Sequence, residues 1–341
     1  MNNSIIFPNL HITLDNVGKG FYIGSFFIAF YGVIIAIGML IGVSFILKEA
    51  KRVGFNEDQF LDICIITIIF GVIGARIYYV AFAWDYYKDN PISVFNIRQG
   101  GLAIYGGVLF GIACIFILSR LKKLNFLRVM DVAMFGVIIG QIFGRWGNFF
   151  NREAFGQYTD GLFAMLLPMD AIRSQSDVTT EMLANLVTVN GVQYISVHPT
   201  FLYESLWNLG LLILLLCTRK KKKFDGYVFF TYLIVYGAGR FWIESLRTDQ
   251  LKLWGTNLAV SQIVAGTLVV LGSGLFVYHL KRHPLQEKQK ILYFFKDIGV
   301  PMSFFYFNFY QILCFLWSDP PLYTTSWRSQ KSLIFHGFWV A

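Results

Sequence analysis

Long apolar runs alternate with short polar segments along most of the chain. Seven runs provide the roughly 20 residues that a helix needs to cross the hydrocarbon core of a bilayer. The first two runs lie at approximately residues 21–47 and 60–82, and the last three at 198–218, 227–246 and 258–278. The third run follows the glycine-rich segment 100–107 and ends near residue 119, and the fourth extends from about residue 129 into the segment 144–156. The pattern predicts an all-α polytopic membrane protein with about seven transmembrane helices.

The distribution of basic residues predicts how these helices are oriented. Clusters of Lys and Arg follow the first, third, fifth and seventh runs, at residues 48–52, 120–128, 219–223 and 281–282. Cytoplasmic loops carry such an excess, so the N-terminus is expected outside and the C-terminus in the cytoplasm. The first apolar run is too long for a signal peptide, and no cleavable one is expected.

Polar sequence between the runs predicts a small extracytoplasmic cap, formed by the insert at residues 151–197. Within it, residues 187–195 alternate around Asn190-Gly191, the pair typical of a tight type I′ turn, and predict a β-hairpin. Residues 1–20 are expected on the membrane surface. Residues 1–285, which include this cap insert, are predicted to form the transmembrane core. Residues 286–341 form a tail to which no role is assigned.

Composition narrows the class of protein. Hydrophobic residues make up 56% of the chain and charged residues 14%, which excludes a soluble globular protein. The net charge of +9 is assigned to cytoplasmic loops, and no nucleic-acid partner is expected. The four cysteines lack paired spacing, and no metal or cofactor motif is present. Gly136, Gly140 and Gly144 recur every four residues and predict close helix packing.

Polar groups gather where the fourth run meets the cap. Charge at membrane depth is costly, so such groups line a cavity or pair with one another. Arg145 and Arg240 are the best candidates for binding an anion, because a guanidinium grips phosphate with parallel donors. Alternatively, Arg240 forms a structural pair with Glu244 one helical turn away, and Arg145 reaches out to the lipid headgroups.

Other polar residues near this boundary also have two interpretations. Asn148 and Asn151 either bind glycerol or phosphate oxygens or cap the end of the fourth helix. Glu153 and Glu204 either orient arginines or act as bases. His198, directly before a proline, fits a helix-entry turn better than a base. Tyr31 and Tyr105 each adjoin glycine and either reach the same cavity or belong to an interfacial aromatic belt.

Several motifs together resemble one known family. Residues 144–156 read Gly-Arg-x-Gly-Asn-Phe-x-Asn-x-Glu-x-x-Gly, which resembles the signature of prolipoprotein diacylglyceryl transferases. Further matching motifs follow in family order, and the resemblance covers roughly residues 5–285. They are Phe30-Tyr31-Gly32, Gly100-Gly101-Leu102 with Gly106-Gly107, His198-Pro199-Thr200 with Tyr203-Glu204, and Gly239-Arg240-Phe241 with Glu244 and Arg247.

The resemblance implies transfer of a diacylglyceryl group from phosphatidylglycerol to the lipobox cysteine of a prolipoprotein signal peptide. A thioether forms and glycerol phosphate leaves, at the outer leaflet of the bacterial cytoplasmic (inner) membrane. The implied catalytic residues are Tyr31, Tyr105, Arg240 and Glu244. The implied phosphatidylglycerol-binding residues are Arg145, Asn148, Asn151, Glu153, Gly156, Glu204 and Arg247.

The chain departs from the family at one of these positions. Many members have histidine where this chain has Tyr105, and that histidine has been proposed as the base for the thiol. A neutral tyrosine, with a pKa near about 10, is a poor base. We therefore expect arginines to lower the thiol pKa and stabilise the departing phosphate, with Tyr105 donating a hydrogen bond.

Other functions fit part of the pattern. A transporter or channel would explain the spans and the intramembrane charges, but no internal repeat is visible. An enzyme that moves polyprenyl-phosphate or acyl groups would also need arginines at the outer face. A membrane scaffold explains the pattern least well, because it has no use for so many ionisable groups at one depth.

Overall fold

Long helices account for most of the computed structural model, which describes residues 4–97, 100–253, 256 and 258–282. Among these residues, six helices are long and apolar enough to cross a membrane: α1 (Phe30–Arg52), α2 (Glu57–Phe82), α4 (Ile104–Leu121), α5 (Phe126–Asn151), α7 (Thr200–Thr218) and α9 (Val260–Arg282). Residues up to Arg282 form one compact unit. The predicted tail, residues 286–341, lies outside the described residues.

The remaining predicted span, the sixth along the chain, is α8 (Tyr227–Leu246), which is long enough to span but carries Arg240 and Glu244. Two short helices, α3 and α6, lie between the long ones. Helix α3 covers Trp84–Tyr87, and α6 covers Thr180–Ala184. The 3₁₀ turns are η1 (Pro8–Leu10), η2 (Pro91–Phe95), η4 (Met169–Ala171) and η5 (Gln175–Asp177). The fold is therefore the predicted helical membrane bundle.

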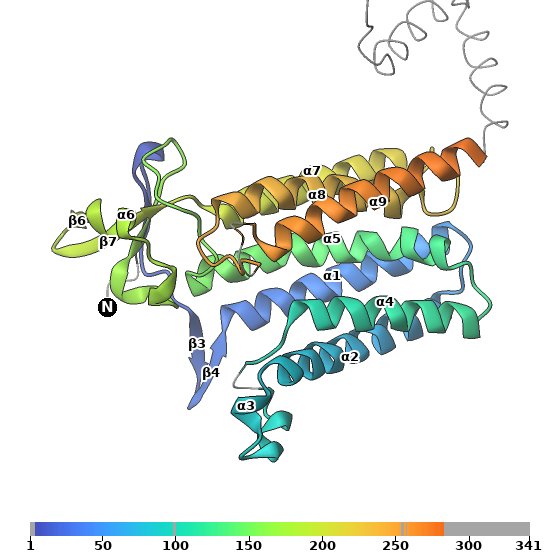
Figure 1. Ribbon diagram of the computed structural model, residues 1–341, viewed down its shortest axis with the longest axis horizontal. Coiled ribbons are helices and arrows are strands. Elements are labelled where there is room, and N and C mark those ends of the chain that lie inside the picture. Colours follow the sequence, from blue (N-terminus) through green and yellow to red (C-terminus); the bar gives the residue numbers. More distant parts are fainter. Residues whose placement is uncertain (1–3, 98–99, 254–255, 257, 283–341) are drawn as a thin grey trace, which may run out of the picture. The chain divides into compact units, whose positions relative to one another are not determined.

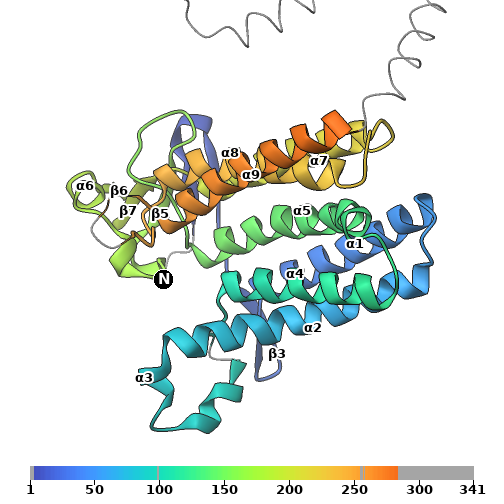
Figure 2. The ribbon, with the colours of Figure 1, turned by 45° about the vertical axis from the view of Figure 1, so that its right-hand side comes forward.

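The long helices run side by side (Figure 1). Helix α5 lies at the centre, packing against α1, α7, α8 and α4, and half of its most apolar window is buried (Figure 2). Helix α2 pairs with α4, and α8 pairs with α9. Asn56 and Asn125 cap the first turns of α2 and α5 by accepting backbone N–H groups, which places both helix starts at one end of the bundle.

Only one of the three stacked glycines makes the close contact that their spacing predicts. A Cβ on Gly136 would lie 3.3 Å from the carbonyl oxygen of Gly42 on α1 and closer still to Ile46. Gly140 faces open space, and Gly144 meets only the tip of Ile35 at 3.6 Å. Gly136 alone of the three therefore makes the predicted close contact, and nearer the cap α1 approaches α5 at Gly147, where a Cβ would lie 2.5 Å from the Tyr31 ring.

The first transmembrane helix begins later than predicted. Residues 21–29 belong to a hairpin of β3 (Gly20–Ile23) and β4 (Phe26–Ala29), and α1 starts only at Phe30. The turn between the strands contains Gly24, at a φ of 60°, which is costly for any residue with a Cβ. The hairpin is as apolar as the helix, so hydropathy alone does not mark the boundary.

The cap is built on a five-stranded antiparallel sheet in the order β2-β1-β5-β7-β6. The predicted hairpin is confirmed, with Asn190 and Gly191 at φ 51° and 79° between β6 and β7. The sequence did not predict that residues 5–14, expected on the membrane surface, supply two strands. The strands are β1 (Ile5–Phe7), β2 (Ile12–Leu14), β5 (Met165–Pro168), β6 (Val187–Val189) and β7 (Val192–Val197).

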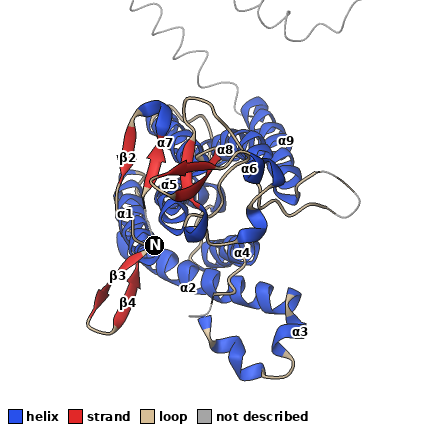
Figure 3. Cartoon of the chain, turned by 90° about the vertical axis from the view of Figure 1, so that its left-hand side faces the viewer, coloured by secondary structure: helices blue, strands red, loops and turns tan. Residues whose placement is uncertain are grey.

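An apolar core joins the cap to the bundle. Phe149 near the end of α5 and Phe201 at the start of α7 pack together, with ring centroids 4.7 Å apart. Both belong to one buried cluster with Ile5, Leu167 and Ile195 of the sheet. Figure 3 shows the strands across this end of the helices. The cap therefore holds together the ends of the helices that carry the candidate polar residues.

The α2–α4 contact yields a test of helix packing. An ideal Cβ on Gly106 would lie 2.4 Å from the Gly74 carbonyl oxygen, where backbone cannot yield easily. We expect Gly106→Ala to destabilise the protein by about 1–3 kcal/mol, the usual cost of overpacking. The thermal unfolding midpoint of purified protein in detergent measures this. Gly210→Ala, which meets nothing within 4 Å, is the control, and equal midpoints would contradict the packing argument.

Candidate active site

One buried carboxylate connects two of the predicted arginines. Glu204, near the start of α7, is 2% exposed. Its Oε1 lies 2.6 Å from Nη2 of Arg145 on α5, and its Oε2 lies 3.0 Å from Nη1 of Arg240 on α8. Three helices that are separate in sequence therefore meet at one ionic group, at the cap end of the bundle.

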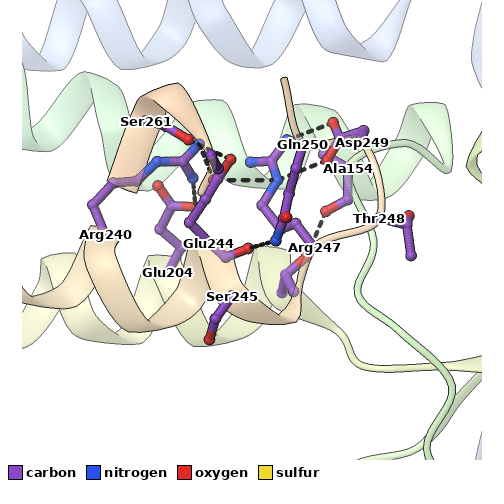
Figure 4. Close-up of polar contacts among 12 residues, drawn as sticks. Ala154, Glu204, Arg240, Glu244, Ser245, Arg247, Thr248, Asp249, Gln250 and Ser261 are labelled. Atoms are coloured by element: carbon purple, nitrogen blue, oxygen red, sulfur yellow. Dashed lines mark hydrogen bonds and ion pairs between the residues drawn. The ribbon is translucent and has the colours of Figure 1, made fainter. Parts of the chain in front are cut away.

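A second buried carboxylate extends this group. Glu244, 3% exposed, lies one turn after Arg240 on α8, and its Oε2 is 2.6 Å from the Arg240 Nη2. The Ser261 hydroxyl on α9 donates to the Glu244 Oε1, and the Arg247 Nε lies 3.8 Å from the Glu244 Oε2 (Figure 4). The structural pair between Arg240 and Glu244 is therefore present, as one part of a larger network.

Arg247 closes the network where α8 ends. It donates two hydrogen bonds to Asp249, from Nε at 2.9 Å and from Nη2 at 2.6 Å. Burial by itself would raise the pKa of Asp249, but the hydrogen bonds and charge of Arg247 outweigh it and hold that pKa below its ordinary value. Asp249 therefore stays ionised and orients Arg247.

The two asparagines bind a carboxylate and do not cap the helix. Asn148 and Asn151 both donate to Oε1 of Glu153, at 2.9 and 3.2 Å, and Arg173 of the cap donates to Oε2 at 2.5 Å. The Asn148 oxygen accepts from Arg145 at 3.3 Å. Arg145 thus turns inward, with its side chain 20% exposed, and links the Glu153 group to the Glu204 group.

Gly156 provides a close backbone contact at the edge of the site. Its N–H donates to the His198 carbonyl oxygen at 3.0 Å, and the residue forms a β-bridge with Arg247. A Cβ there would lie 2.7 Å from the His198 Cβ and 2.9 Å from the Leu246 oxygen. Glycine therefore lets the start of the cap dock against the ends of α7 and α8.

The two tyrosines reach the network from separate helices. The Tyr31 ring packs on Gly147 and lies within electrostatic range of Arg145 and Glu153. Tyr105, at the start of α4, lies within electrostatic range of Arg240 and Glu244. Its hydroxyl makes no hydrogen bond to any residue that the structure describes. Both tyrosines therefore lie near the charged network, on different sides of it.

The position of Tyr105 depends on Arg76 of α2. Arg76 is 7% exposed and makes no ion pair within the described part of the chain. Its guanidinium donates instead to backbone carbonyls of the segment that leads into α4, those of Ser93, Val94, Asn96, Gly100 and Gly101. A backbone hydrogen bond from the Ala103 N–H to the Ala75 carbonyl oxygen, at 3.0 Å, also fixes the start of α4.

His198 has the structural role that the sequence favoured. Its backbone accepts from Gly156 and donates to Gln157 at 3.0 Å, and its Nδ1 lies 3.3 Å from the Tyr203 hydroxyl. Burial lowers its pKa, so the ring is neutral at pH 7. It lies beside the network as a turn residue at the entry to α7.

Sequence reasoning missed several members of the site. Asp249 had a local signal, since it follows Arg247 by two residues. Arg173, Ser261 and Arg76 had none, because their partners are distant in sequence or are backbone carbonyls. Within the described residues, no group of three or more His, Cys, Asp or Glu side chains is placed to hold a metal ion.

The arrangement is suited to binding an anion. Each guanidinium carries five N–H donors, and the contacts of Arg145 and Arg240 occupy only some of them. The carboxylates hold both planes in fixed orientations, so the remaining donors are preorganised. Fold and site together define a multi-pass membrane protein with a network of arginines and carboxylates buried at the end of its bundle.

Comparison with known proteins identifies the family. Residues 19–278 match the family model described as prolipoprotein diacylglyceryl transferase. The chain is 43% identical over 256 residues to a Clostridioides difficile protein, covering 75% of this chain and 92% of that protein. It is 40% identical over 263 residues to a Bacillus cytotoxicus protein, covering 76% and 89%. Both are named phosphatidylglycerol–prolipoprotein diacylglyceryl transferase. The chain belongs to the prolipoprotein diacylglyceryl transferase family.

The shared carboxylate yields a stability test. Glu204→Gln leaves Arg145 and Arg240 close together without the charge between them, and breaking a buried ion pair costs about 3–5 kcal/mol. We expect a clearly lower thermal unfolding midpoint in detergent. Glu57→Gln removes a carboxylate from an exposed pair with Lys51, worth at most about 1 kcal/mol, and is the control. Equal midpoints for the two variants would show that Glu204 does not hold the helices together.

Proposed function

We propose that this protein transfers the diacylglyceryl group of phosphatidylglycerol to the lipobox cysteine of prolipoproteins, the first step of bacterial lipoprotein maturation. Membership of the family supports the reaction. The observation that carries it is the bridge from Arg145 through Glu204 to Arg240, because it places two guanidiniums together at one end of a membrane bundle.

The proposed orientation places this site at the outer leaflet. The basic segments after α1 and α7 lie at the end of the bundle away from the cap, where Arg219 pairs with Glu49 at 2.6 Å. The excess of basic residues at that end favours the cytoplasm, which leaves the cap and the N-terminus outside. Both substrates, an outer-leaflet phospholipid and a translocated signal peptide, would then reach the site from the same side.

In the proposed complex, Arg145 and Arg240 hold the lipid phosphate. Glu204 and Glu244 orient the guanidiniums, while Asn148, Asn151 and Glu153 bind the glycerol oxygens. Gly156 lets the lipid approach the backbone, and Arg247 adds positive charge at the edge. Tyr31 borders the lipid on the side of Arg145. A planar guanidinium with fixed donors suits a phosphodiester better than a mobile ammonium.

The chemistry requires stabilisation of the leaving group. The cysteine sulfur forms a bond to the glycerol carbon, the carbon–oxygen bond breaks, and its electron pair leaves with glycerol phosphate. The phosphodiester, with one negative charge, becomes a monoester with up to two, since the second phosphate pKa is about 6. The arginines interact more strongly with that product-like charge than with the substrate, which lowers the barrier.

The same positive charge favours the reactive form of the thiol. A free thiol has a pKa near about 8.5, so a small fraction is ionised at neutral pH. Nearby guanidiniums stabilise the thiolate and raise that fraction. The thiol proton is released to water or to the product phosphate. Tyr105 donates a hydrogen bond where many family members have histidine, so the proposal needs no side-chain base at this position.

A transfer assay separates this proposal from the alternatives. Purified protein is incubated with phosphatidylglycerol carrying a radiolabelled diacylglyceryl group and a lipobox peptide, and a peptide with serine in place of cysteine is the control. We expect label on the cysteine peptide alone, with inhibition by unlabelled phosphatidylglycerol and none by polyprenyl phosphate. Absence of transfer, or inhibition by polyprenyl phosphate instead, would favour a transporter or a polyprenyl-phosphate enzyme.

Bidentate phosphate binding predicts the effect of a conservative substitution. Arg240→Lys keeps the charge but loses the fork of donors that faces Glu204, Glu244 and the lipid. We expect kcat of the transfer reaction to fall about a hundredfold, the scale of losing one preorganised donor. Arg120→Lys, at the other end of the bundle, is the matched control. Unchanged turnover in Arg240→Lys would refute the bidentate role.

The departure from the family at residue 105 has its own test. If Tyr105 donates a hydrogen bond during transfer, Tyr105→Phe should lower kcat by about tenfold or more while the ring still packs as before. Tyr105→His introduces the residue common in the family and should retain more activity than phenylalanine. Full activity in Tyr105→Phe would mean that the hydroxyl has no chemical role.

A further inference from the structure

A second group of cations surrounds a cavity at the end of the bundle opposite the cap. The cavity has a volume of about 330 Å³. It lies where α1 and α7 end and where α5 begins, and the cap-end site takes no part in it. Its lining consists of Arg52, Val53, Arg128, Arg219, Lys220, Lys222 and Asp225.

The cavity wall is organised around a buried carboxylate. Glu49, 3% exposed, accepts from Arg52 at 2.5 and 2.8 Å and from Arg219 at 2.6 Å. The Arg219 Nε is buried and has no hydrogen-bond partner among the described residues. A positive-inside bias needs only exposed basic residues on loops. Two guanidiniums fixed on one buried carboxylate form a more ordered arrangement than that bias requires.

Two of the other cations of the lining have no carboxylate partner among the described residues. Arg128 donates to the Val53 carbonyl oxygen and lies 5.0 Å over the Phe55 ring, with no carboxylate contact in the described part of the chain. Lys220 is exposed and forms no ion pair with a described residue. Lys222 lies between Asp131 at 3.5 Å and Asp225 at 3.3 Å. Five cations therefore face three carboxylates, counting Glu49, which leaves an excess of positive charge.

The height of the cavity in the membrane indicates the kind of anion. Arg128 and Arg145 lie 17 positions apart on α5, about 26 Å at 1.5 Å per residue. That distance is close to the thickness of the hydrocarbon core, about 30 Å. With the cap-end site at one headgroup layer, the cavity lies at the other, and basic pockets between transmembrane helices at that level bind anionic headgroups.

We propose that this cavity binds the headgroup of an anionic phospholipid from the leaflet opposite the catalytic site. The phosphate lies against Arg128 and Lys220, whose donors are not committed to carboxylates, and Arg52 and Arg219 form the wall behind it. Because the excess charge exceeds one, a lipid with two phosphodiesters fits the cavity better than one with a single phosphodiester. The bound lipid ties the ends of α1, α5 and α7 together.

The test counts lipids bound to full-length protein by native mass spectrometry. The probe is tetraoleoyl cardiolipin, with dioleoyl phosphatidylcholine as the zwitterionic comparison. Arg128→Gln combined with Lys220→Gln removes two charges from the cavity without breaking an ion pair. Arg120→Gln combined with Lys221→Gln removes the same charges from the same end of the bundle, outside the cavity lining. Counting bound molecules separates this site from lipid held at the cap end.

We expect the cavity variant to bind one cardiolipin at least tenfold more weakly than the wild type, and the matched variant and Arg128→Lys to bind it normally. Equal weakening in the two double variants, or none in the cavity variant, would overturn the proposal. Free glycerol phosphate is added in a separate arm, and displacement of cardiolipin by it would mean a soluble phosphate site instead. If the double variant does not fold, Lys220→Gln alone provides the same comparison.

Discussion

Burying a carboxylate between two guanidiniums is the constraint on which the cap end of this protein depends. Glu204 is almost fully enclosed, and a lone charge at that depth would cost several kcal/mol. Arg145 and Arg240 remove that cost only if α5, α7 and α8 meet at one height. The ionic group therefore fixes helix register, and the same geometry leaves two aligned sets of N–H donors available to an anion. Helix register and the proposed anion binding therefore depend on the same interaction.

The apolar cluster of the cap supports this arrangement from outside. Phe149 and Phe201 come from the ends of the two helices that supply Arg145 and Glu204, and they pack into the core of the sheet. Gly156 lets the chain pass close to His198 and Leu246 on its way into the cap. The polar network is thus covered by apolar packing on the side of the cap, which limits the water that could screen its charges.

The sequence predicted the helices and singled out the candidate site residues because both depend on strong local signals. Runs of about 20 apolar residues identify spans, and arginines and carboxylates inside such runs are rare enough to be noticed. The start of α1 was misplaced because the β3–β4 hairpin is equally apolar. The strands at residues 5–14 were missed because their partner, β5, is distant in the chain. The contacts of Arg173 with Glu153, of Ser261 with Glu244 and of Arg76 with backbone carbonyls were invisible for the same reason: they join segments with no shared pattern.

The strand order of the cap has a consequence for biogenesis. Strand β1 precedes the first membrane helix and pairs with β2, but its other neighbour in the sheet is β5, which follows α5 in the chain. The amino-terminal strands can therefore complete the sheet only after about half of the polypeptide has been synthesised. The sheet can therefore close only late in synthesis, after the central helices have been made. A nascent chain that stalls before that point would carry an unpaired edge on β1, which is open to pairing with other chains.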